Sequence, residues 1–421
     1  MSDKKETFEI AEAGSSEHIK HGTGSSIGAY FTILCALAGT GTLGLPQAVA
    51  KSGWVGVLLI ILGALFAIYT GLKLVQVIDK KADAKIETYP DVGAAAFGLP
   101  GRILVQFCQY TIIGGGVTLY MVYSGGVMKN LALINGTEIS IKYLIIVAGV
   151  IIWIPLVTFK KIQEVFFIGV FGALATLVAV ILVVVLGFID LSKFESHGAF
   201  DDVVWENVPL SLSTICFAYG GTVVFPQVYR SMAKPQQWPV VVTTSTLSAF
   251  AFYVLTAVVG YYVYGREVKS PIFESLPKGA PNLAGQVLMM IHVLAAGVIF
   301  LCSLSLELER YFKITVEHMG RGKEFAIRAV ARTSILALLV LIGCFVPYFG
   351  DLMSLVGAFS ECMLVFVVPL TCHLKIFGIR GRPIYEYVWI AILYVVAAVC
   401  VVMGTIDAIK ALIHDVKTNP V

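Results

Sequence analysis

Charged residues are scarce in this chain. Asp, Glu, Lys and Arg make up 14% of its 421 residues, whereas hydrophobic residues make up 58%. A soluble domain has about 25% charged residues. The formal net charge is +3, which is too small to favour a nucleic-acid partner. We therefore expect an integral membrane protein that does not bind nucleic acid.

Metal-binding and catalytic motifs are also missing. The eight cysteines all lie within or at the ends of apolar runs, and they form no CxxC motif or Cys/His cluster; they are Cys35, Cys108, Cys216, Cys302, Cys344, Cys362, Cys372 and Cys400. This pattern predicts packed thiols rather than disulfides, and no metal site. The chain contains no HExxH motif and no clustered Ser/His/Asp set, so we do not expect an enzyme.

Long apolar runs dominate the chain instead. Each crossing of a bilayer needs about 20 mostly apolar residues. Eleven stretches qualify: 27–50, 54–78, 103–129, 141–159, 163–189, 208–231, 240–264, 284–310, 326–346, 350–374 and 385–411. We expect an all-α membrane protein with eleven transmembrane helices, the last of them within 385–412, and a short non-cytoplasmic tail at 413–421. Residues 1–26 are expected to be a disordered cytoplasmic segment without a cleavable signal peptide.

Basic residues predict the orientation of these helices. An odd number of spans places the two termini on opposite sides of the membrane. If the N-terminus is cytoplasmic, 21 of the 30 Lys and Arg residues lie on the inner side, as the positive-inside rule favours. The glycosylation sequon at Asn135–Thr137 then lies outside the cell or in the lumen, where glycosylation requires it.

Two apolar runs contain strong helix breakers near their midpoints. The first span reads "GTGTLGLPQAVAKSGW" at 39–54, with three glycines and a proline in its first eight residues. The sixth span reads "FAYGGTVVFPQVYRSM" at 217–232, with two central glycines and a proline five residues later. Because glycine and proline are the weakest helix formers, we expect unwound backbone over Thr40–Gly44 and Ala218–Gly221.

Each break begins a group of five spans, 27–190 and 208–375. Five crossings are an odd number, so the second group enters the membrane in the opposite sense, which predicts a 5+5 inverted-repeat transporter fold. Unwound backbone at membrane depth is tolerated where it lines a cavity. There, free N–H groups suit a carboxylate and free carbonyls suit a cation. The alternative is that these glycines only allow close helix packing.

The two broken segments resemble the amino acid/auxin permease family. The resemblance is carried by the break at Gly39–Gly44 with Leu45-Pro46 and Gly53-Trp54 after it, and by Phe217–Gly221 with Pro226 and Lys234-Pro235 after it. It implies an eleven-span transporter with broken helices 1 and 6. It further implies movement of amino acids coupled to an ion, most often a proton.

The same resemblance implies where an amino acid would bind, between spans 1, 3, 6 and 8. Its carboxylate would meet the backbone of Thr40, Gly41, Thr42, Leu43 and Gly44, and its ammonium group the carbonyls of Phe217 and Ala218. The side chains of Phe217 and Tyr219 would shape the pocket, unless they serve only helix packing. Gly220 and Gly221 would let the substrate approach closely.

Four side chains at membrane depth are candidates for ion coupling, because polar groups there are costly and often functional. Glu361, midway along the tenth span, is a candidate proton carrier, or else a neutral structural residue. His292 in the eighth span is a candidate proton relay, or a packing residue. Ser303 and Ser305 lie on different faces of the same span, and one of them could offer its hydroxyl to a sodium ion.

We therefore predict a multi-pass secondary active transporter, a symporter of small neutral amino acids that works by alternating access as a monomer. A neutral substrate is favoured because no charged side chain lies in or beside the two breaks. No cofactor is expected; the coupling ion is a proton, with sodium as the alternative. A non-transporting amino-acid sensor of the same fold stays open, whereas a channel is disfavoured because the spans lack a continuous polar face. The plasma membrane and a vacuolar or lysosomal membrane are both compatible.

Overall fold

The computed structural model describes residues 22–81, 86, 88–134, 136–158, 166–191, 199–314 and 320–418. Most of the predicted N-terminal segment, Asn135 of the sequon, and residues 419–421 of the tail lie outside the described residues. Within the described part there is no β-strand, only an isolated bridge between Gly24 and Met232.

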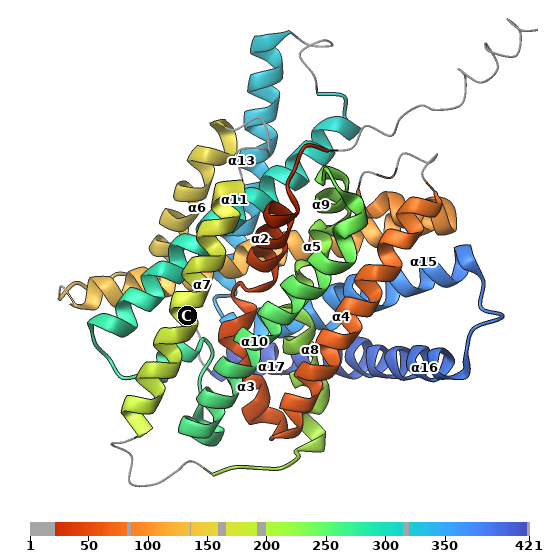
Figure 1. The fold of residues 1–421 in the computed structure, drawn as a ribbon. Helices are drawn as coiled ribbons and strands as arrows, with labels where there is room; N and C mark the ends of the chain where they lie inside the picture. Colours follow the sequence, from red (N-terminus) through yellow and green to blue (C-terminus); the bar gives the residue numbers. More distant parts are fainter. Residues whose placement is uncertain are drawn as a thin grey trace, which may run out of the picture.

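The apolar runs form helices that together make a bundle (Figure 1). The helices of the first half are α2 (Ser26–Leu37), α3 (Gly41–Ser52), α4 (Val55–Lys80), α5 (Tyr89–Ile134), α6 (Ile141–Thr158) and α7 (Phe166–Leu191). Those of the second half are α8 (Val208–Ala218), η4 (Gly220–Val224), α9 (Phe225–Ser231), α10 (Trp238–Tyr264), α11 (Ala280–Tyr311), α13 (Arg321–Phe345), α14 (Phe349–Val356), η8 (Gly357–Glu361), η9 (Met363–Val367), α15 (Val368–Phe377), α16 (Ile384–Val399), η10 (Cys400–Gly404) and α17 (Thr405–Thr418). Short 3₁₀ turns lie in the connections at Trp205–Asn207, Pro235–Gln237, Gly265–Glu267 and Ile272–Glu274.

The number of membrane-crossing helices agrees with the sequence prediction. The described residues form ten helices long and apolar enough to cross a bilayer, and up to eleven when α2 and α3, bent by 47°, count as one broken span. The prediction of an all-α membrane protein is confirmed.

Two helix ends differ from the predicted ones. Helix α5 extends back to Tyr89, because a preceding helix joins the third span through a kink at Gly98; the part after the kink begins close to the predicted 103. Gly98 has a φ of 66°, a left-handed conformation that glycine adopts without steric cost. The last helix runs to Thr418, beyond the predicted boundary at 412, because residues 405–418 form a strongly amphipathic helix with one apolar face.

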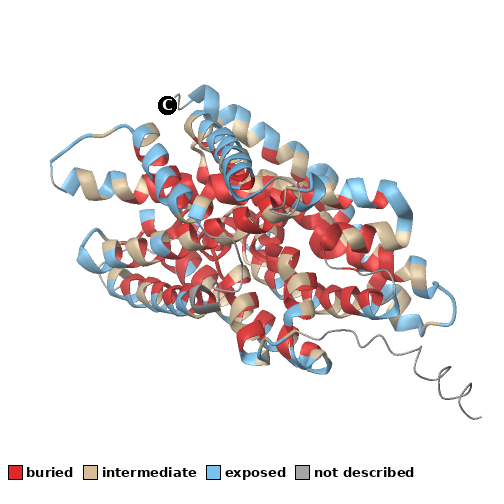
Figure 2. Cartoon of the chain, turned by 90° about the horizontal axis from the view of Figure 1, so that it is seen from above, coloured by how far each residue is buried: buried red, intermediate tan, exposed pale blue. Residues whose placement is uncertain are grey.

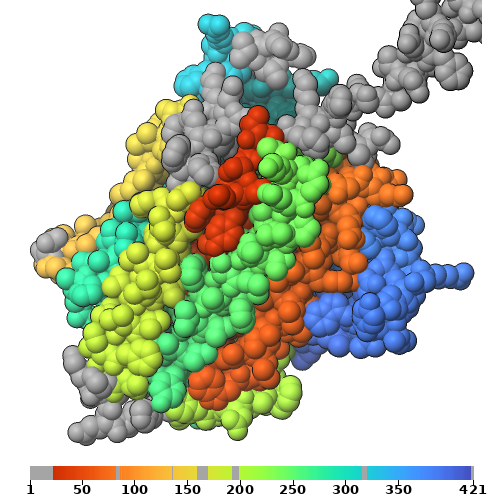
Figure 3. Space-filling view, in the orientation of Figure 1, coloured from red at the N-terminus to blue at the C-terminus, as the bar shows by residue number. Residues whose placement is uncertain are grey.

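The two broken spans lie in the middle of the bundle. In the span Trp205–Ser231, 83% of the most apolar segment is buried, compared with 22% in Arg321–Phe345. Helix α2 packs on α7 and α10, and α3 packs on α8 and α10; Figure 3 shows α2 between α7 and α10 on one face. Viewed from above, buried residues fill the centre and exposed ones the rim (Figure 2). The breaks are therefore shielded from lipid, as unpaired backbone requires.

Candidate functional site

The first break lies between α2 and α3, at residues 38–40. The backbone N–H of Gly39 donates to the carbonyl of Leu37 at 2.8 Å, a tight turn that interrupts the helical ladder. Two carbonyls at the end of α2 accept hydrogen bonds from side chains of other spans: Leu37 from the hydroxyl of Tyr253 at 2.6 Å, and Ala38 from that of Thr176 at 2.7 Å. The carbonyls that the break releases are therefore largely satisfied within the protein.

The polar groups on the other side of this break, at the start of α3, have fewer hydrogen-bond partners. Helix α3 starts at Gly41, and its N-cap residue Thr40 makes no side-chain capping hydrogen bond. The buried hydroxyls of Thr40 and Thr42 have no hydrogen-bond partner among the described residues. The first N–H groups of a helix have no partner within the helix and carry a partial positive charge. The start of α3 is thus suited to receive an anionic group.

The second break lies between α8 and α9. Helix α8 ends at Ala218, and the chain then forms a 3₁₀ turn, η4, before α9 starts at Phe225. The expectation of unwound backbone over Ala218–Gly221 is therefore wrong in its extent, because Ala218 is still helical and Gly220 and Gly221 belong to the 3₁₀ turn. Pro226 occupies the first turn of α9, where its missing N–H costs nothing. The hydroxyl of Tyr253 is also within hydrogen-bonding distance of the carbonyl of Ala218, so one side chain links the two breaks.

Glycines bring the two broken segments into backbone contact. A Cβ atom added to Gly41 would lie 2.6 Å from Cα of Ala218, and one added to Gly221 would lie 2.8 Å from the backbone N of Leu37. A Cβ atom does not come this close to non-bonded atoms in real structures, and main-chain atoms, unlike the end of a side chain, cannot rotate away to make room. The sequence places glycine at both positions, and the two breaks can therefore meet.

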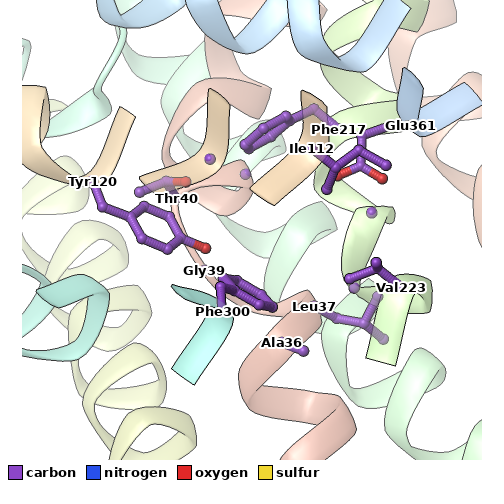
Figure 4. Close-up of a pocket in the computed structure, with 14 residues that line it drawn as sticks. Ala36, Leu37, Gly39, Thr40, Ile112, Tyr120, Phe217, Val223, Phe300 and Glu361 are labelled. Carbon is purple, nitrogen blue, oxygen red and sulfur yellow. The ribbon is translucent and has the colours of Figure 1, made fainter. Parts of the chain in front are cut away.

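A small cavity lies at this meeting point. Its walls come from spans 1, 3, 6, 8 and 10 (Figure 4); the lining residues are Ala36, Leu37, Gly39, Thr40, Gly41, Ile112, Gly116, Tyr120, Phe217, Gly220, Gly221, Val223, Phe300 and Glu361. Only about 30 Å³ of it is open to the centre of a water molecule, so the cavity must widen before it can hold an amino acid. The walls are mostly apolar; their polar features are the start of α3, the hydroxyl of Tyr120 and one carboxyl group.

Glu361 supplies that carboxyl group. It ends the π-helical segment η8 and is 3% exposed. A Cβ atom on Gly220 would overlap the carboxyl group of Glu361, so the carboxyl group lies against the 3₁₀ turn η4 of span 6. Its Oε2 atom is buried and has no hydrogen-bond partner among the described residues. Figure 4 shows Glu361 beside Phe217 and Ile112. This carboxyl group is placed to interact with a cation or to exchange a proton.

The predicted substrate-binding residues fall into two groups. Thr40, Gly41, Phe217, Gly220 and Gly221 line the cavity. The others, Thr42, Leu43, Gly44, Ala218 and Tyr219, are not among the lining residues.

The second group lies outside the lining for identifiable reasons. The expectation of unwound backbone over Thr40–Gly44 is wrong in its extent: the break lies at 38–40, and Gly41–Gly44 form the first turn of α3. A glycine costs only about 1 kcal/mol in a helix, and packing against α8 and α10 outweighs it. The hydroxyl of Tyr219 points to another span and donates to the carbonyl of Ile60 at 2.8 Å.

The other candidates for ion coupling lie away from the cavity. Nδ1 of the buried His292 lies 3.8 Å from Sγ of Cys35. Ser303 exchanges hydrogen bonds of 3.0 and 3.2 Å with the side chain of Gln227 in α9. The hydroxyl of Ser305 is 2% exposed and has no partner among the described residues. None of the three lines the cavity.

Sequence reasoning missed the residues that hold the breaks in place. Tyr253 and Thr176 lie in spans without a central break made of glycine and proline, and nothing in their local sequence marks them. Ile112, Tyr120 and Phe300 line the cavity, but apolar and aromatic residues are common in all the spans. Only the contacts between distant spans identify them.

Tyr253 provides a direct test of this arrangement. Replacing it with phenylalanine removes the hydroxyl that lies on the carbonyls of Leu37 and Ala218. Leaving buried carbonyls unpaired costs about 1–3 kcal/mol, so we expect Tyr253→Phe to lower the thermal unfolding midpoint of the purified protein. The exposed Tyr143, changed to phenylalanine in the same way, should leave it unchanged. Equal midpoints for both variants would contradict a structural role for this hydroxyl.

Comparison with known proteins adds an independent observation. Residues 22–413 match the family described as "Transmembrane amino acid transporter protein". The chain is 28% identical to amino acid transporter AVT1B of Arabidopsis thaliana over 91% of this chain and 70% of that one. It is 27% identical to AVT1I of the same organism, over 94% and 97%. It is 24% identical to the human vesicular inhibitory amino acid transporter, over 91% and 75%.

The fold also matches a solved structure. The crystal structure of MhsT in complex with L-phenylalanine superposes with a TM-score of 0.61 at 13% sequence identity, over 92% of this chain and 99% of that one. At this identity the likeness establishes the fold alone. It confirms the predicted inverted-repeat architecture with broken helices 1 and 6.

Proposed function

Because the chain belongs to the transmembrane amino acid transporter family, we propose that it is a secondary active transporter of small neutral amino acids, coupled to protons and working by alternating access. The observation that carries this proposal is the cavity at which the two broken spans meet, with the start of α3 and the carboxyl group of Glu361 in its walls.

The two ends of an amino acid fit different parts of this cavity. The uncapped start of α3 at Thr40 and Gly41 favours the carboxylate. The ammonium group is expected to lie toward Phe217, at the end of α8, and Glu361 of span 10. The carbonyl of Ala218 is less open to it, because that carbonyl shares the hydroxyl proton of Tyr253 with the carbonyl of Leu37. Ile112, Phe300 and the ring of Tyr120 give the substrate side chain apolar surroundings. The described residues that line the cavity include no Lys or Arg, which argues against an acidic substrate.

Glu361 is the proposed proton carrier. A carboxyl group beside the 3₁₀ turn η4 of span 6 can gain a proton from one side and release it to the other as the cavity changes access. Burial of a lone carboxylate is costly. The change of the protein between its two access states, with or without substrate, would therefore depend on whether Glu361 is protonated. This dependence is what couples a proton gradient to the movement of substrate.

A cationic amino acid is the second candidate substrate. The position of Glu361 in the cavity wall favours it, because a buried carboxylate is the natural partner of a cationic side chain. Sodium coupling through Ser303 or Ser305 is the alternative to protons. We further propose that the protein acts as a monomer with a cytoplasmic N-terminus. The human relative is named as vesicular, which supports an organelle membrane over the plasma membrane.

Uptake into proteoliposomes tests these proposals together. Purified protein is reconstituted, a pH or a sodium gradient is imposed, and uptake of neutral, cationic and acidic amino acids is compared. We expect accumulation of small neutral amino acids driven by the pH gradient. Accumulation driven by sodium and indifferent to pH would reject the proton, and preference for a cationic substrate would reject the neutral class. Binding without accumulation under any gradient would indicate a sensor.

A further inference from the structure

Three cysteines that are far apart in the sequence meet in the bundle. They are Cys216 in α8, Cys362 between η8 and η9, and Cys400 at the start of η10. Their Sγ atoms all lie within 4.8 Å of one another, and those of Cys216 and Cys400 are 3.5 Å apart. All three side chains are fully buried, and none forms a disulfide.

The backbone around this three-cysteine cluster is built for close approach. A Cβ atom on Gly357 would overlap the carbonyl of Ser213, and one on Gly404 would overlap the hydroxyl of Ser213. Ser213 lies one helical turn before Cys216, so the two glycines let spans 10 and 11 press against α8 at the level of the cluster.

The cluster also lies at irregular helix turns. The helices carrying Cys362 and Cys400 are π-helical there, at 357–361, 363–367 and 400–404. Such turns are rare and occur frequently at functional sites. The carbonyls nearest to the thiols of Cys362 and Cys400 are those of Ala397, at 3.7 Å, and Ala358, at 3.6 Å. These weak bonds leave the sulfur atoms available to a ligand.

We propose that Cys216, Cys362 and Cys400 form a binding site for one soft metal ion of the Cu⁺ or Zn²⁺ class. Thiolate ligands select these ions. A metal–sulfur bond of about 2.3 Å places the sulfur atoms of a three-coordinate site about 4 Å apart, which the observed spacing allows. For an ion that prefers four ligands, the hydroxyl of Ser213, 3.9 Å from Sγ of Cys400, supplies the fourth donor.

Charge balance follows from the chemistry of the thiols. Each thiol that becomes a thiolate releases one proton when the metal binds. One thiolate neutralises Cu⁺ and two neutralise Zn²⁺, and the remaining thiols bind through a sulfur lone pair. The complex is then electrically neutral, as burial in an apolar interior favours.

The cluster lies directly behind the cavity wall. Phe217 and Glu361 line the cavity, and Cys216 and Cys362 are their immediate neighbours in sequence. A bound ion would therefore tie α8 to spans 10 and 11 beside the broken part of span 6. Under the proposed alternating access, such a tie would slow transport. Binding of the metal itself does not depend on the transport proposal.

Cadmium binding to the purified full-length protein tests the site. Reduced, metal-free protein is titrated with Cd²⁺, and the ultraviolet thiolate-to-metal charge-transfer band is followed. We expect one ion per chain, displaced by Zn²⁺ or Cu⁺ according to which class the site prefers. Metal content of the protein from cells grown with added zinc or copper gives the same comparison without cadmium.

Variants separate this cluster from the other thiols. Cys216→Ser, Cys362→Ser and Cys400→Ser should each weaken Cd²⁺ binding at least about tenfold. Cys372→Ser and Cys302→Ser, which change buried cysteines outside the cluster, should leave it unchanged. Size-exclusion profiles check folding, and alanine replaces serine in any variant that aggregates. Absence of the band and of bound metal in the wild-type protein, or an undiminished band in the triple variant, would overturn the proposal.

Discussion

Replacing Gly221 with leucine is expected to abolish transport. A Cβ atom at this position meets the backbone of Ala36 and Leu37 at 2.8 Å, so any larger residue must push the two broken segments apart. A displacement of about 1 Å in a binding site costs roughly a hundredfold in activity, and leucine demands more than that. Gly41→Leu should have the same effect, because its Cβ atom would lie 2.6 Å from Cα of Ala218. Uptake of amino acid into proteoliposomes is the measurement.

Gly126→Leu is the matched control for these two variants. Gly126 lies in α5, and a Cβ atom there meets no atom within 4 Å. Transport by this variant should stay close to that of the wild type. Size-exclusion profiles of all three proteins establish whether they remain folded, and Gly221→Ala provides a milder change if leucine prevents folding. Wild-type uptake by both Gly41→Leu and Gly221→Leu would exclude the proposed site.

Replacing Glu361 with glutamine is expected to remove the coupling to protons. Glutamine has nearly the same shape as the protonated carboxyl group but cannot release a proton. Wild-type uptake should rise as the pH falls on the side from which substrate enters. Glu361→Gln should show no such dependence. It should also accumulate at least about tenfold less substrate under a pH gradient than the wild type does. Exchange of labelled for unlabelled substrate across the membrane needs no net proton movement and should persist.

The exchange measurement makes this prediction decisive. A variant that accumulates nothing but still exchanges substrate has an intact cavity and has lost its coupling. Loss of both activities in a folded variant would instead indicate that Glu361 binds the substrate, as expected for a cationic amino acid. Asp407→Asn, which alters a carboxylate of span 11 that pairs with Lys410 at 3.6 Å, should change neither activity. Proton-driven accumulation by Glu361→Gln would exclude Glu361 as the carrier.

The sequence by itself determined the membrane class, the number of spans and the place of the two breaks to within a few residues. Each of these depends on local composition: about 20 apolar residues predict a span, and clustered glycine and proline weaken a helix wherever they occur. The family predicted from "GTGTLGLPQAVAKSGW" and the segment after Phe217 is confirmed. It could be predicted because each of these motifs is a contiguous stretch of the chain. Glu361 could be singled out because a carboxylate in an apolar run is conspicuous without any structure.

Only the tertiary structure decided which of these residues meet. The first break lies at 38–40 rather than over Thr40–Gly44, because contacts of α3 with α8 and α10 keep its first turn helical. Glu361 reaches the cavity because span 10 packs against Gly220, 141 positions earlier in the chain, and Tyr253 joins the two breaks from a span with no distinctive local sequence. The three clustered cysteines are separated by 146 and 38 positions, so no spacing rule could bring them together. Local propensity acts over a few residues, whereas packing between spans determines every contact that builds the cavity.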